Sequence, residues 1–143
     1  MKALSDRVAD SEDGLARVTV VDDQLGRLTF TRDMARTIFW LLGYREGDVE
    51  PSAPAAFGTY NMTGSGRVAS WYEIARAVFE RANGNGAAVV PVSTGEYYAA
   101  ASGPVAPRPV HSALDLSKLC AAGFTPPDWE EELAVYVDAL RGC

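Results

Sequence analysis

The sequence predicts an α+β fold with three or four helices and a few short strands. Three observations support this. Apolar residues recur at helical spacing in three stretches, short β-branched runs lie between them, and the chain has 143 residues. That length suits one domain with a core that needs no disulfide. We therefore expect one small lobe, and we find no internal repeat.

The first predicted helix covers residues 32–42, with Thr31 as its expected N-cap and Gly43 as its C-terminal stop. Its apolar residues recur three and four positions apart, which places them on one face. This stripe comprises Met34, Ala35, Ile38, Phe39 and Leu42.

The second predicted helix covers residues 71–82. Ser70 and Glu73 form the S-x-x-E pattern of a capping box, and Asn83 to Gly86 end the helix. Its expected buried face consists of Trp71, Ile74, Ala75, Val78 and Phe79.

The last predicted helix covers residues 129–141, with Asp128 as N-cap and Glu131 at its third position. Its apolar residues are Leu133, Val135, Tyr136, Val137 and Leu140. A shorter helix, capped by Asp115, is expected to run through Ala122 and to stop at Gly123, with Cys120 as a small buried residue on it.

Short strands are predicted at residues 17–22, 58–62 and 88–93. The internal Pro91 favours an edge position for the last of these, because proline donates no ladder hydrogen bond. Residues 94–109 are expected to form a loop that carries Tyr97 and Tyr98.

Charge and composition exclude several classes of function. The 13 basic and 19 acidic residues give a net charge of −6, which argues against a nucleic-acid partner. No apolar run approaches the roughly 20 residues that span a bilayer, and no signal-peptide pattern opens the chain. We therefore expect a soluble cytoplasmic protein with no membrane partner. Cys120, Cys143 and His111 are too few for a structural zinc site, so we expect no metal.

Catalytic motifs are sparse. Gly64 to Ala69 fits G-x-G-x-x-A between a predicted strand and a predicted helix, but no strand ending in an acidic residue follows about 20 positions later. We interpret it as a flexible loop. Lys118 has Leu114 four residues earlier, so the Tyr-x-x-x-Lys pair of short-chain reductases is absent, and we expect no catalytic residue in this chain. The acidic run of residues 130–132 indicates a solvated helix start.

Arg108 lies between Pro107 and Pro109, which stiffen the backbone around it. A rigidly placed guanidinium in the loop of Tyr97 and Tyr98 suits a phosphate and a stacked ring. A surface ion pair is the alternative interpretation, and the spacing alone leaves both open.

Several segments together resemble dTDP-4-dehydrorhamnose reductases. Residues 20–26, followed by Thr29 and residues 33–35, are similar to that family's "VVDDQxGxPTxxxDLA". Residues 58–66 and 70–75 resemble "GxYHxxxxGxxSWYEFA". Residues 108–119 resemble "RPxxSxLDxxKL", and residues 127–129 with the closing helix match "LPxWxxxL".

The resemblance is to the carboxyl-terminal, substrate-binding part of these extended short-chain dehydrogenases. It implies that residues 1–16 are the end of a linking helix and a loop, and that residues 17–143 are the substrate-binding lobe. The missing amino-terminal Rossmann domain would hold NADPH, or NADH in some members, and would reduce dTDP-4-dehydro-L-rhamnose to dTDP-L-rhamnose. We therefore expect this chain alone to bind no cofactor and to be inactive.

By motif position, the resemblance implies that Gln24, Gly26 and Thr29 line the sugar-nucleotide cleft and that Arg108 faces the phosphates. Trp71 and Tyr72 are expected to be packing residues. Two positions depart from the family: Leu28 replaces a usual proline and His111 a common asparagine.

The resemblance also implies partners. These are a dTDP-sugar and the chain's own Rossmann domain, whose absence would expose an unpaired strand edge and an apolar docking face that self-association covers. Two alternatives stay open: a non-catalytic α/β binding or interaction module, and the matching lobe of a related sugar-nucleotide epimerase or dehydratase.

Overall fold

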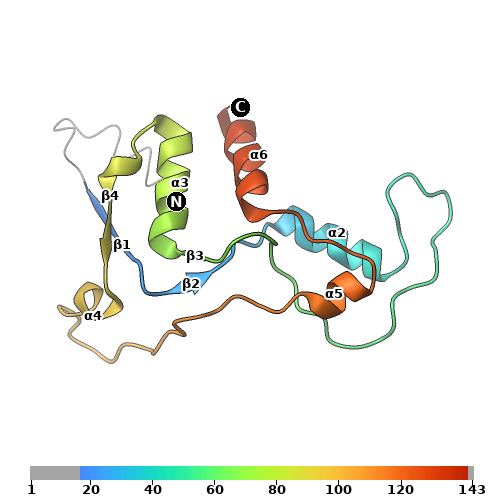
Figure 1. The fold of residues 1–143 in the computed structure, drawn as a ribbon, viewed down its shortest axis with the longest axis horizontal. Helices are drawn as coiled ribbons and strands as arrows, with labels where there is room; N and C mark the ends of the chain where they lie inside the picture. The colour runs from blue at the N-terminus through green and yellow to red at the C-terminus, as the bar shows by residue number, and fades with distance from the viewer. Residues whose placement is uncertain (1–16, 142–143) are drawn as a thin grey trace. The chain divides into compact units, whose positions relative to one another are not determined.

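The computed structural model describes residues 17–141, and their contacts form two compact units. The sheet unit comprises residues 17–26, 68–112 and 133–141, and the helical unit comprises residues 27–67 and 113–132. Where the sequence predicts one lobe, the contacts thus form two bodies, each stabilised by its own buried side chains. Figure 1 shows the elements of both, and the α+β class is confirmed.

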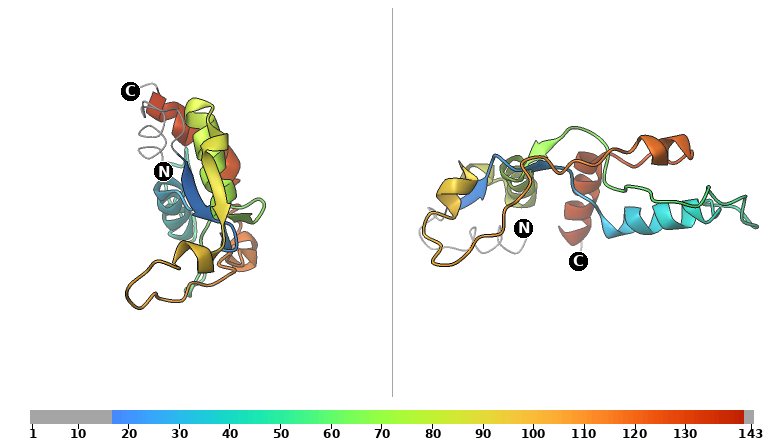
Figure 2. Two further views of the ribbon diagram at one scale, coloured as in Figure 1. Left: turned by 90° about the vertical axis from the view of Figure 1, so that its left-hand side faces the viewer. Right: turned by 90° about the horizontal axis from the view of Figure 1, so that it is seen from below.

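The sheet unit is built on two parallel strands, β1 (Val18–Val21) and β4 (Val89–Val92), paired in register from Val18 opposite Val89. These confirm the strands predicted at 17–22 and 88–93. Parallel strands need a crossover connection. The helix α3 (Trp71–Asn83) lies in that connection and against both strands, as Figures 1 and 2 show.

The core of the sheet unit lies between α3 and these strands. Ala75, Phe79, Ala88 and Val89 are buried, and Tyr72 packs against them as predicted, together with Val18 and Val20. Trp71 was expected in the same buried face, but 39% of it is exposed. It is the first residue of α3, where the helix extends beyond the core.

Both ends of α3 follow the sequence. The Ser70 hydroxyl accepts from the Glu73 amide at 3.1 Å, and the Glu73 carboxylate accepts from the Ser70 amide at 2.8 Å, which confirms the capping box. Gly84 closes the helix in the left-handed conformation. The two-residue strand β3 (Ala69–Ser70) directly precedes α3 and pairs antiparallel with the two-residue strand β2 (Leu25–Gly26). After α3, the 3₁₀ turn η1 (Gly86–Ala88) leads into β4.

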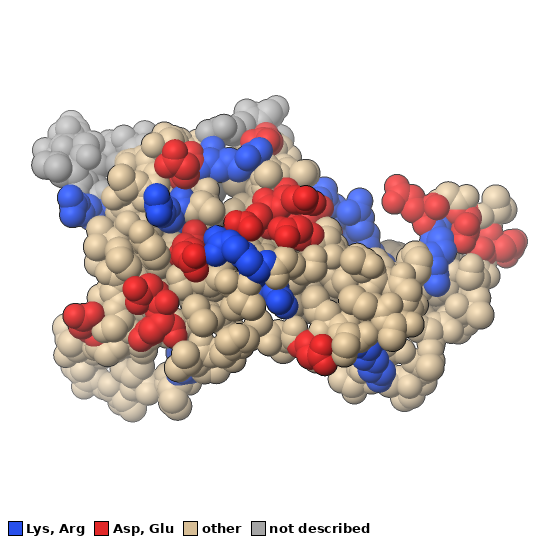
Figure 3. All heavy atoms as spheres, in the orientation of Figure 1, with Lys and Arg blue, Asp and Glu red and all other residues tan. Residues whose placement is uncertain are grey.

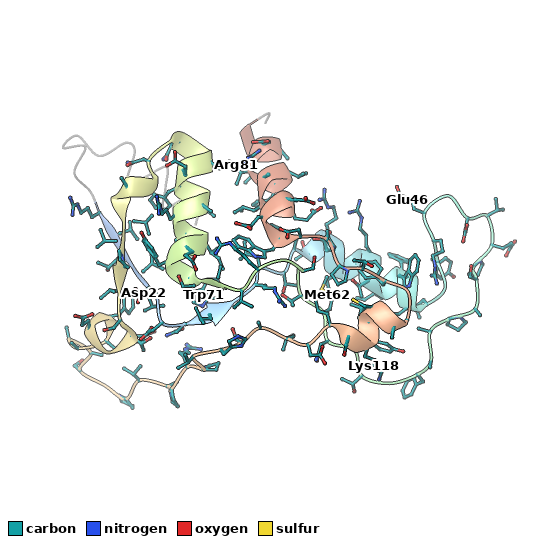
Figure 4. All side chains as sticks on the ribbon, viewed as in Figure 1. Asp22, Glu46, Met62, Trp71, Arg81 and Lys118 are labelled. Atoms are coloured by element: carbon teal, nitrogen blue, oxygen red, sulfur yellow. The ribbon has the colours of Figure 1, made fainter. Side chains whose placement is uncertain are left out.

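The helix α6 (Trp129–Arg141) contributes Leu133 and Val137 to the buried residues. Arg81 extends from α3 towards it (Figure 4), donating to the Ala134 carbonyl and, at 2.6 Å, to the Asp138 carboxylate. The remaining apolar residues predicted for this helix, Val135, Tyr136 and Leu140, are exposed.

The helical unit holds α2 (Thr31–Leu41), α5 (Ser117–Ala121) and the first turn of α6. Trp129 is fully buried and donates its indole N–H to the Arg67 carbonyl at 2.8 Å. Asp128 caps α6 as predicted, because its carboxylate accepts from the Glu130 amide at 2.8 Å.

Three local predictions in this unit are wrong. Thr31 is the first residue of α2, whose N-cap is Phe30 and has no side-chain capping bond. The N-cap of α5 is Leu116 and not Asp115, whose carboxylate accepts from the amide and hydroxyl of Ser117, so α5 begins one residue later than expected. Cys120 is exposed, because its helix neighbour Leu119 takes the buried position.

The strand predicted at residues 58–62 is absent. Among the described residues, no backbone group of this segment pairs with another strand. Side chains support the segment instead: the Lys118 ammonium donates to the Thr59 carbonyl at 2.8 Å and lies 4.5 Å from the Tyr60 ring centre, and Asn61 donates to the Asp115 carbonyl. Figure 4 marks Lys118 and Met62 in this region. An extended sequence forms a strand only beside a partner.

The helix α2 is buried on its polar side. Asp33 and Thr37 are almost completely buried, whereas Met34, Ile38, Phe39 and Leu42 are about half exposed. An apolar helical stripe ordinarily faces a core. On α2 the stripe forms an exposed surface, which we call the α2 apolar face.

The surface carries mixed charge. Figure 3 shows acidic and basic side chains interspersed on the visible face. Within residues 17–141, no helix combines the length and apolarity that a membrane crossing requires.

The core of the sheet unit depends on Phe79, which is fully buried. Phe79→Ala should lower the free energy of unfolding by about 3–5 kcal/mol, because it removes buried apolar area and leaves a cavity. Urea unfolding followed by circular dichroism measures this. Phe57→Ala removes the same ring from a fully exposed position and should change stability by less than about 0.5 kcal/mol. Equal effects of the two substitutions would contradict this account of the core.

Asp33 is a buried carboxylate in the first turn of α2. Its Oδ1 accepts no hydrogen bond within the described residues, and the guanidinium nitrogens of Arg32 and Arg36 lie 3.9 and 3.7 Å from it. Burial raises the pKa of Asp33, and the negative charge of Glu132 adds to this, while the two arginines act in the opposite direction. Glu132 itself is ion-paired with Arg32.

A raised pKa in the folded state makes low pH stabilising. The folded protein then binds the proton more tightly than the unfolded chain, so stability is gained as pH falls through the raised pKa and lost as pH rises. Asp33→Asn should therefore stabilise the protein at neutral pH, and this advantage should shrink between about pH 7 and pH 4. Urea unfolding of both proteins over this range checks it. The loop variant Asp48→Asn serves as control, and a pH-independent difference for Asp33→Asn would refute the assignment.

Candidate functional site

The sheet unit contains a hollow of about 300 Å³ beside β1. Three valines and Thr19, at residues 18–21, form one wall, and the rings of Trp71, Tyr97 and Tyr98 form the others. Trp71 is labelled at the start of α3 in Figure 4. The two tyrosine rings meet edge to face with their centres 5.0 Å apart. Gln24 is the only amide side chain that lines this hollow in the described residues.

A chain of hydrogen bonds fixes Gln24. Its Nε2 donates to the Thr94 hydroxyl at 2.8 Å, and that hydroxyl donates to Asp23 Oδ1 at 2.6 Å. The Thr94 amide donates to Asp23 Oδ2 at 2.9 Å. These bonds with Thr94 lower the pKa of Asp23, so its carboxylate stays ionised at neutral pH.

Thr94 belongs to a short helix, α4 (Thr94–Tyr97), where the sequence predicted a loop. The Ser93 hydroxyl accepts from the Glu96 amide at 3.2 Å, and the Glu96 carboxylate accepts from the Ser93 amide at 3.1 Å. The Ser93 hydroxyl, which donates to Glu96 Oε2 at 2.6 Å, and the Ser93 amide lower the pKa of Glu96. Sequence reasoning missed Asp23 and Thr94. The S-x-x-E pattern of Ser93 and Glu96 was the signal that could have located α4.

The loop that carries Arg108 is anchored beside β2. The Leu25 amide donates to the Val110 carbonyl at 2.7 Å, and the Leu25 carbonyl accepts from both the amide and the hydroxyl of Ser112. Arg108 is exposed, and its side chain forms no ion pair or hydrogen bond with the described residues. Gly26 is buried in β2, where a Cβ atom would lie 2.8 Å from the Ser112 hydroxyl. The structure thus brings Gln24, Gly26 and the Arg108 loop into one unit.

Thr29 belongs to the helical unit. Its hydroxyl donates to the Thr63 hydroxyl at 3.0 Å, and it is itself exposed. Nearby, Arg27 donates to the carbonyls of Gly66 and Leu114. Thr29 is therefore not part of the hollow that Gln24 lines.

The glycine-rich turn at residues 64–69 is packed against the start of α6. A Cβ on Gly64 would lie 2.8 Å from the Trp129 Cβ, and Gly66, at φ +89°, lies against the Asp128 carboxylate. The Ser65 amide and carbonyl pair with Pro127 and Trp129. These contacts hold the turn in place, where the sequence predicted a flexible loop.

A larger hollow, of about 700 Å³, lies in the helical unit next to the α2 apolar face. Its walls include Phe39, Trp40 and Tyr44, and the Arg45 guanidinium lies 3.5 Å from the centre of the Trp40 ring. Arg45 also donates to the Trp40 carbonyl at 2.7 Å, so its charge is already engaged. None of the sequence-predicted site residues lines this hollow. No group of three potential metal ligands was found within residues 17–141.

A family model described as the RmlD substrate binding domain matches residues 3–141. The chain belongs to this family. The match covers β1, the hollow and both units, and it confirms the resemblance drawn from the motifs.

Curated relatives include two of stated function. The spore coat polysaccharide biosynthesis protein SpsK of Bacillus subtilis is 34% identical over 118 residues, covering 82% of this chain and 35% of the relative. The dTDP-4-dehydrorhamnose reductase of Aggregatibacter actinomycetemcomitans is 32% identical over 133 residues, covering 89% and 41%. The chain therefore spans between about a third and two fifths of the length of these relatives.

Solved structures of dTDP-4-dehydrorhamnose reductases are similar to this chain. The dTDP-4-dehydrorhamnose reductase of Bacillus anthracis, in complex with NADP, superposes with a TM-score of 0.67 at 28% identity, covering 93% of this chain and 40% of that one. The ortholog from Clostridium acetobutylicum superposes with a TM-score of 0.72 at 25% identity, covering 99% and 44%. Each match is to part of a longer reductase.

Proposed function

We propose that this chain is the substrate-binding part of an NADPH-dependent dTDP-4-dehydrorhamnose reductase, which converts dTDP-4-dehydro-L-rhamnose to dTDP-L-rhamnose. The observation that carries the proposal is the aromatic hollow with the fixed amide of Gln24, in a chain that matches the substrate-binding family over nearly its whole length. Aromatic walls suit a planar base, and a few placed polar groups give such a site its specificity.

Arg108 supplies the charge that a sugar nucleotide needs. Pro107 and Pro109 restrict the backbone on either side of it, and the hydrogen bonds of Leu25 with Val110 and Ser112 hold the end of its loop beside β2. A planar guanidinium can bind a diphosphate at two points. The alternative interpretation of Arg108, a surface ion pair, gains no support, because its guanidinium has no acidic partner among the described residues.

The glycine pattern of residues 64–69 is not followed, about 20 positions later, by a strand ending in the acidic residue that a dinucleotide-binding turn requires. In the proposal NADPH, the hydride donor, is therefore bound by a separate Rossmann domain of the parent enzyme. The α2 apolar face and the unpaired segment at residues 58–62 suit contact with such a domain. The first offers apolar surface, and the second offers backbone groups that could extend a sheet.

Arg108→Ala should weaken binding of dTDP-L-rhamnose about 10- to 100-fold, the effect of losing charge-assisted hydrogen bonds to phosphate. Calorimetric titration of the 143-residue chain measures it, with melting temperature recorded on the same samples. The control Arg76→Ala removes an exposed arginine of α3 and should leave the affinity unchanged. A lower melting temperature with unaltered affinity would contradict a phosphate-binding role.

The same titration with NADPH in place of dTDP-L-rhamnose should show no stoichiometric binding to the unaltered chain. A saturable NADPH signal would contradict the placement of the cofactor in a separate domain.

The α2 apolar face should make the isolated chain self-associate, because exposed apolar area is covered by a second copy when its partner domain is absent. Sedimentation velocity at rising concentration should show this, and an apolar fluorescent dye should bind. Ile38→Glu, at a position 52% exposed, should abolish both signals. Val110→Glu, at an exposed loop position, should abolish neither. A strictly monomeric chain that binds no dye would refute this role of α2.

A further inference from the structure

The hydrogen-bond chain in the sheet unit determines which end of the Gln24 amide points away from Thr94. The Thr94 hydroxyl has a single hydrogen, and the ionised Asp23 carboxylate can only accept, so that hydrogen is donated to Asp23 Oδ1 at 2.6 Å. Towards Gln24 the hydroxyl can then only accept. Gln24 must therefore present its NH₂ group to Thr94, as the 2.8 Å contact has it.

The opposite corner of the amide, Gln24 Oε1, is consequently an acceptor. No described residue donates a hydrogen bond to Oε1, and Gln24 lines the hollow beside Trp71, Tyr97 and Tyr98. Rotating the amide would set its oxygen against an oxygen that has no hydrogen left to donate. The orientation of the Gln24 amide is thus determined by Asp23, which fixes the direction of the Thr94 hydroxyl.

The ring that fits this arrangement is one with a donor on its edge. Thymine carries an imide N3–H between two carbonyl groups, whereas the corresponding ring nitrogen of cytosine is an acceptor and would oppose Oε1. Leaving two acceptors face to face in a partly buried site costs more than a lost hydrogen bond. Apolar and aromatic walls provide the stacking surface, and Gln24 provides the polar contact.

We propose that Gln24 Oε1 accepts the imide N–H of a thymine base bound in this hollow, and that Thr94, held by Asp23, is the positioning residue that sets this specificity. The inference rests on the proposed function, which supplies a dTDP-sugar as ligand. Beyond the proposed function, it identifies the edge of the base that is bound. It also identifies Asp23 and Thr94 as the residues that determine the preference for thymine without contacting the ligand.

The experiment compares dTDP with N3-methyl-dTDP, which lacks only the imide hydrogen and carries a methyl group in its place. In the unaltered chain, calorimetry should give a dissociation constant about tenfold lower for dTDP. Thr94→Val keeps the shape of the side chain but removes the hydroxyl, so the Gln24 amide can turn either end to the base and this ratio should fall. Thr94→Ser restores the hydroxyl and should restore the ratio. The matched control Ser93→Ala weakens the capping box of α4 without touching Gln24, and it should keep the tenfold preference.

The outcomes separate this inference from the proposed function. If both nucleotides bind the unaltered chain equally, the base-edge assignment is overturned while the proposed function stands. If neither binds, the proposed function falls, and this inference with it. If Thr94→Val folds and keeps the preference, or if Ser93→Ala loses it as well, the positioning role of Thr94 is overturned. The comparison of nucleotides on the unaltered chain needs no variant to fold.

Discussion

The parallel pairing of β1 with β4 is the constraint on which the sheet unit depends. Parallel strands cannot be joined by a tight turn, so a helical crossover must intervene, and α3 fills that role with Phe79 and Ala75 against Val89. The hollow is a consequence of the same pairing. Gln24 follows the end of β1 and Thr94 follows the end of β4, and two parallel strands bring their carboxyl ends to one edge. A polar contact between residues 70 positions apart thus follows from strand direction.

In the helical unit, two segments adopt a structure that their own sequences do not favour. Residues 58–62 have a strand's sequence and no strand partner among the described residues, and α2 buries Asp33 and Thr37 while its apolar side is exposed. Both features have one physical cause, which is that β-pairing and apolar burial each require a second surface. Relatives more than twice as long as this chain are consistent with such a surface in a longer protein.

The candidate site combines residues of two kinds. Gln24, Gly26 and Arg108 were expected from motif position, and the sheet unit holds all three, whereas Thr29 belongs to the other unit. Asp23 and Thr94 were not expected. They are ordinary polar residues, and their role depends on which group donates and which accepts in a chain of hydrogen bonds. The spacing of residues along the sequence does not predict this. The single proton of the Thr94 hydroxyl links an ionised carboxylate to an amide and so gives that amide a direction.

The sequence by itself determined the features that depend on near neighbours. The capping box of Ser70 and Glu73, the stop at Gly84 and the strands around Val18 and Val89 all follow from local backbone chemistry. The family also followed from the sequence, because its motifs are short and ordered along the chain. Only the tertiary structure decided which face of α2 is buried, that residues 58–62 lack a partner, and that Thr94 orients Gln24. Each of these depends on contacts between distant segments, and periodicity along one segment carries no information about what lies opposite it.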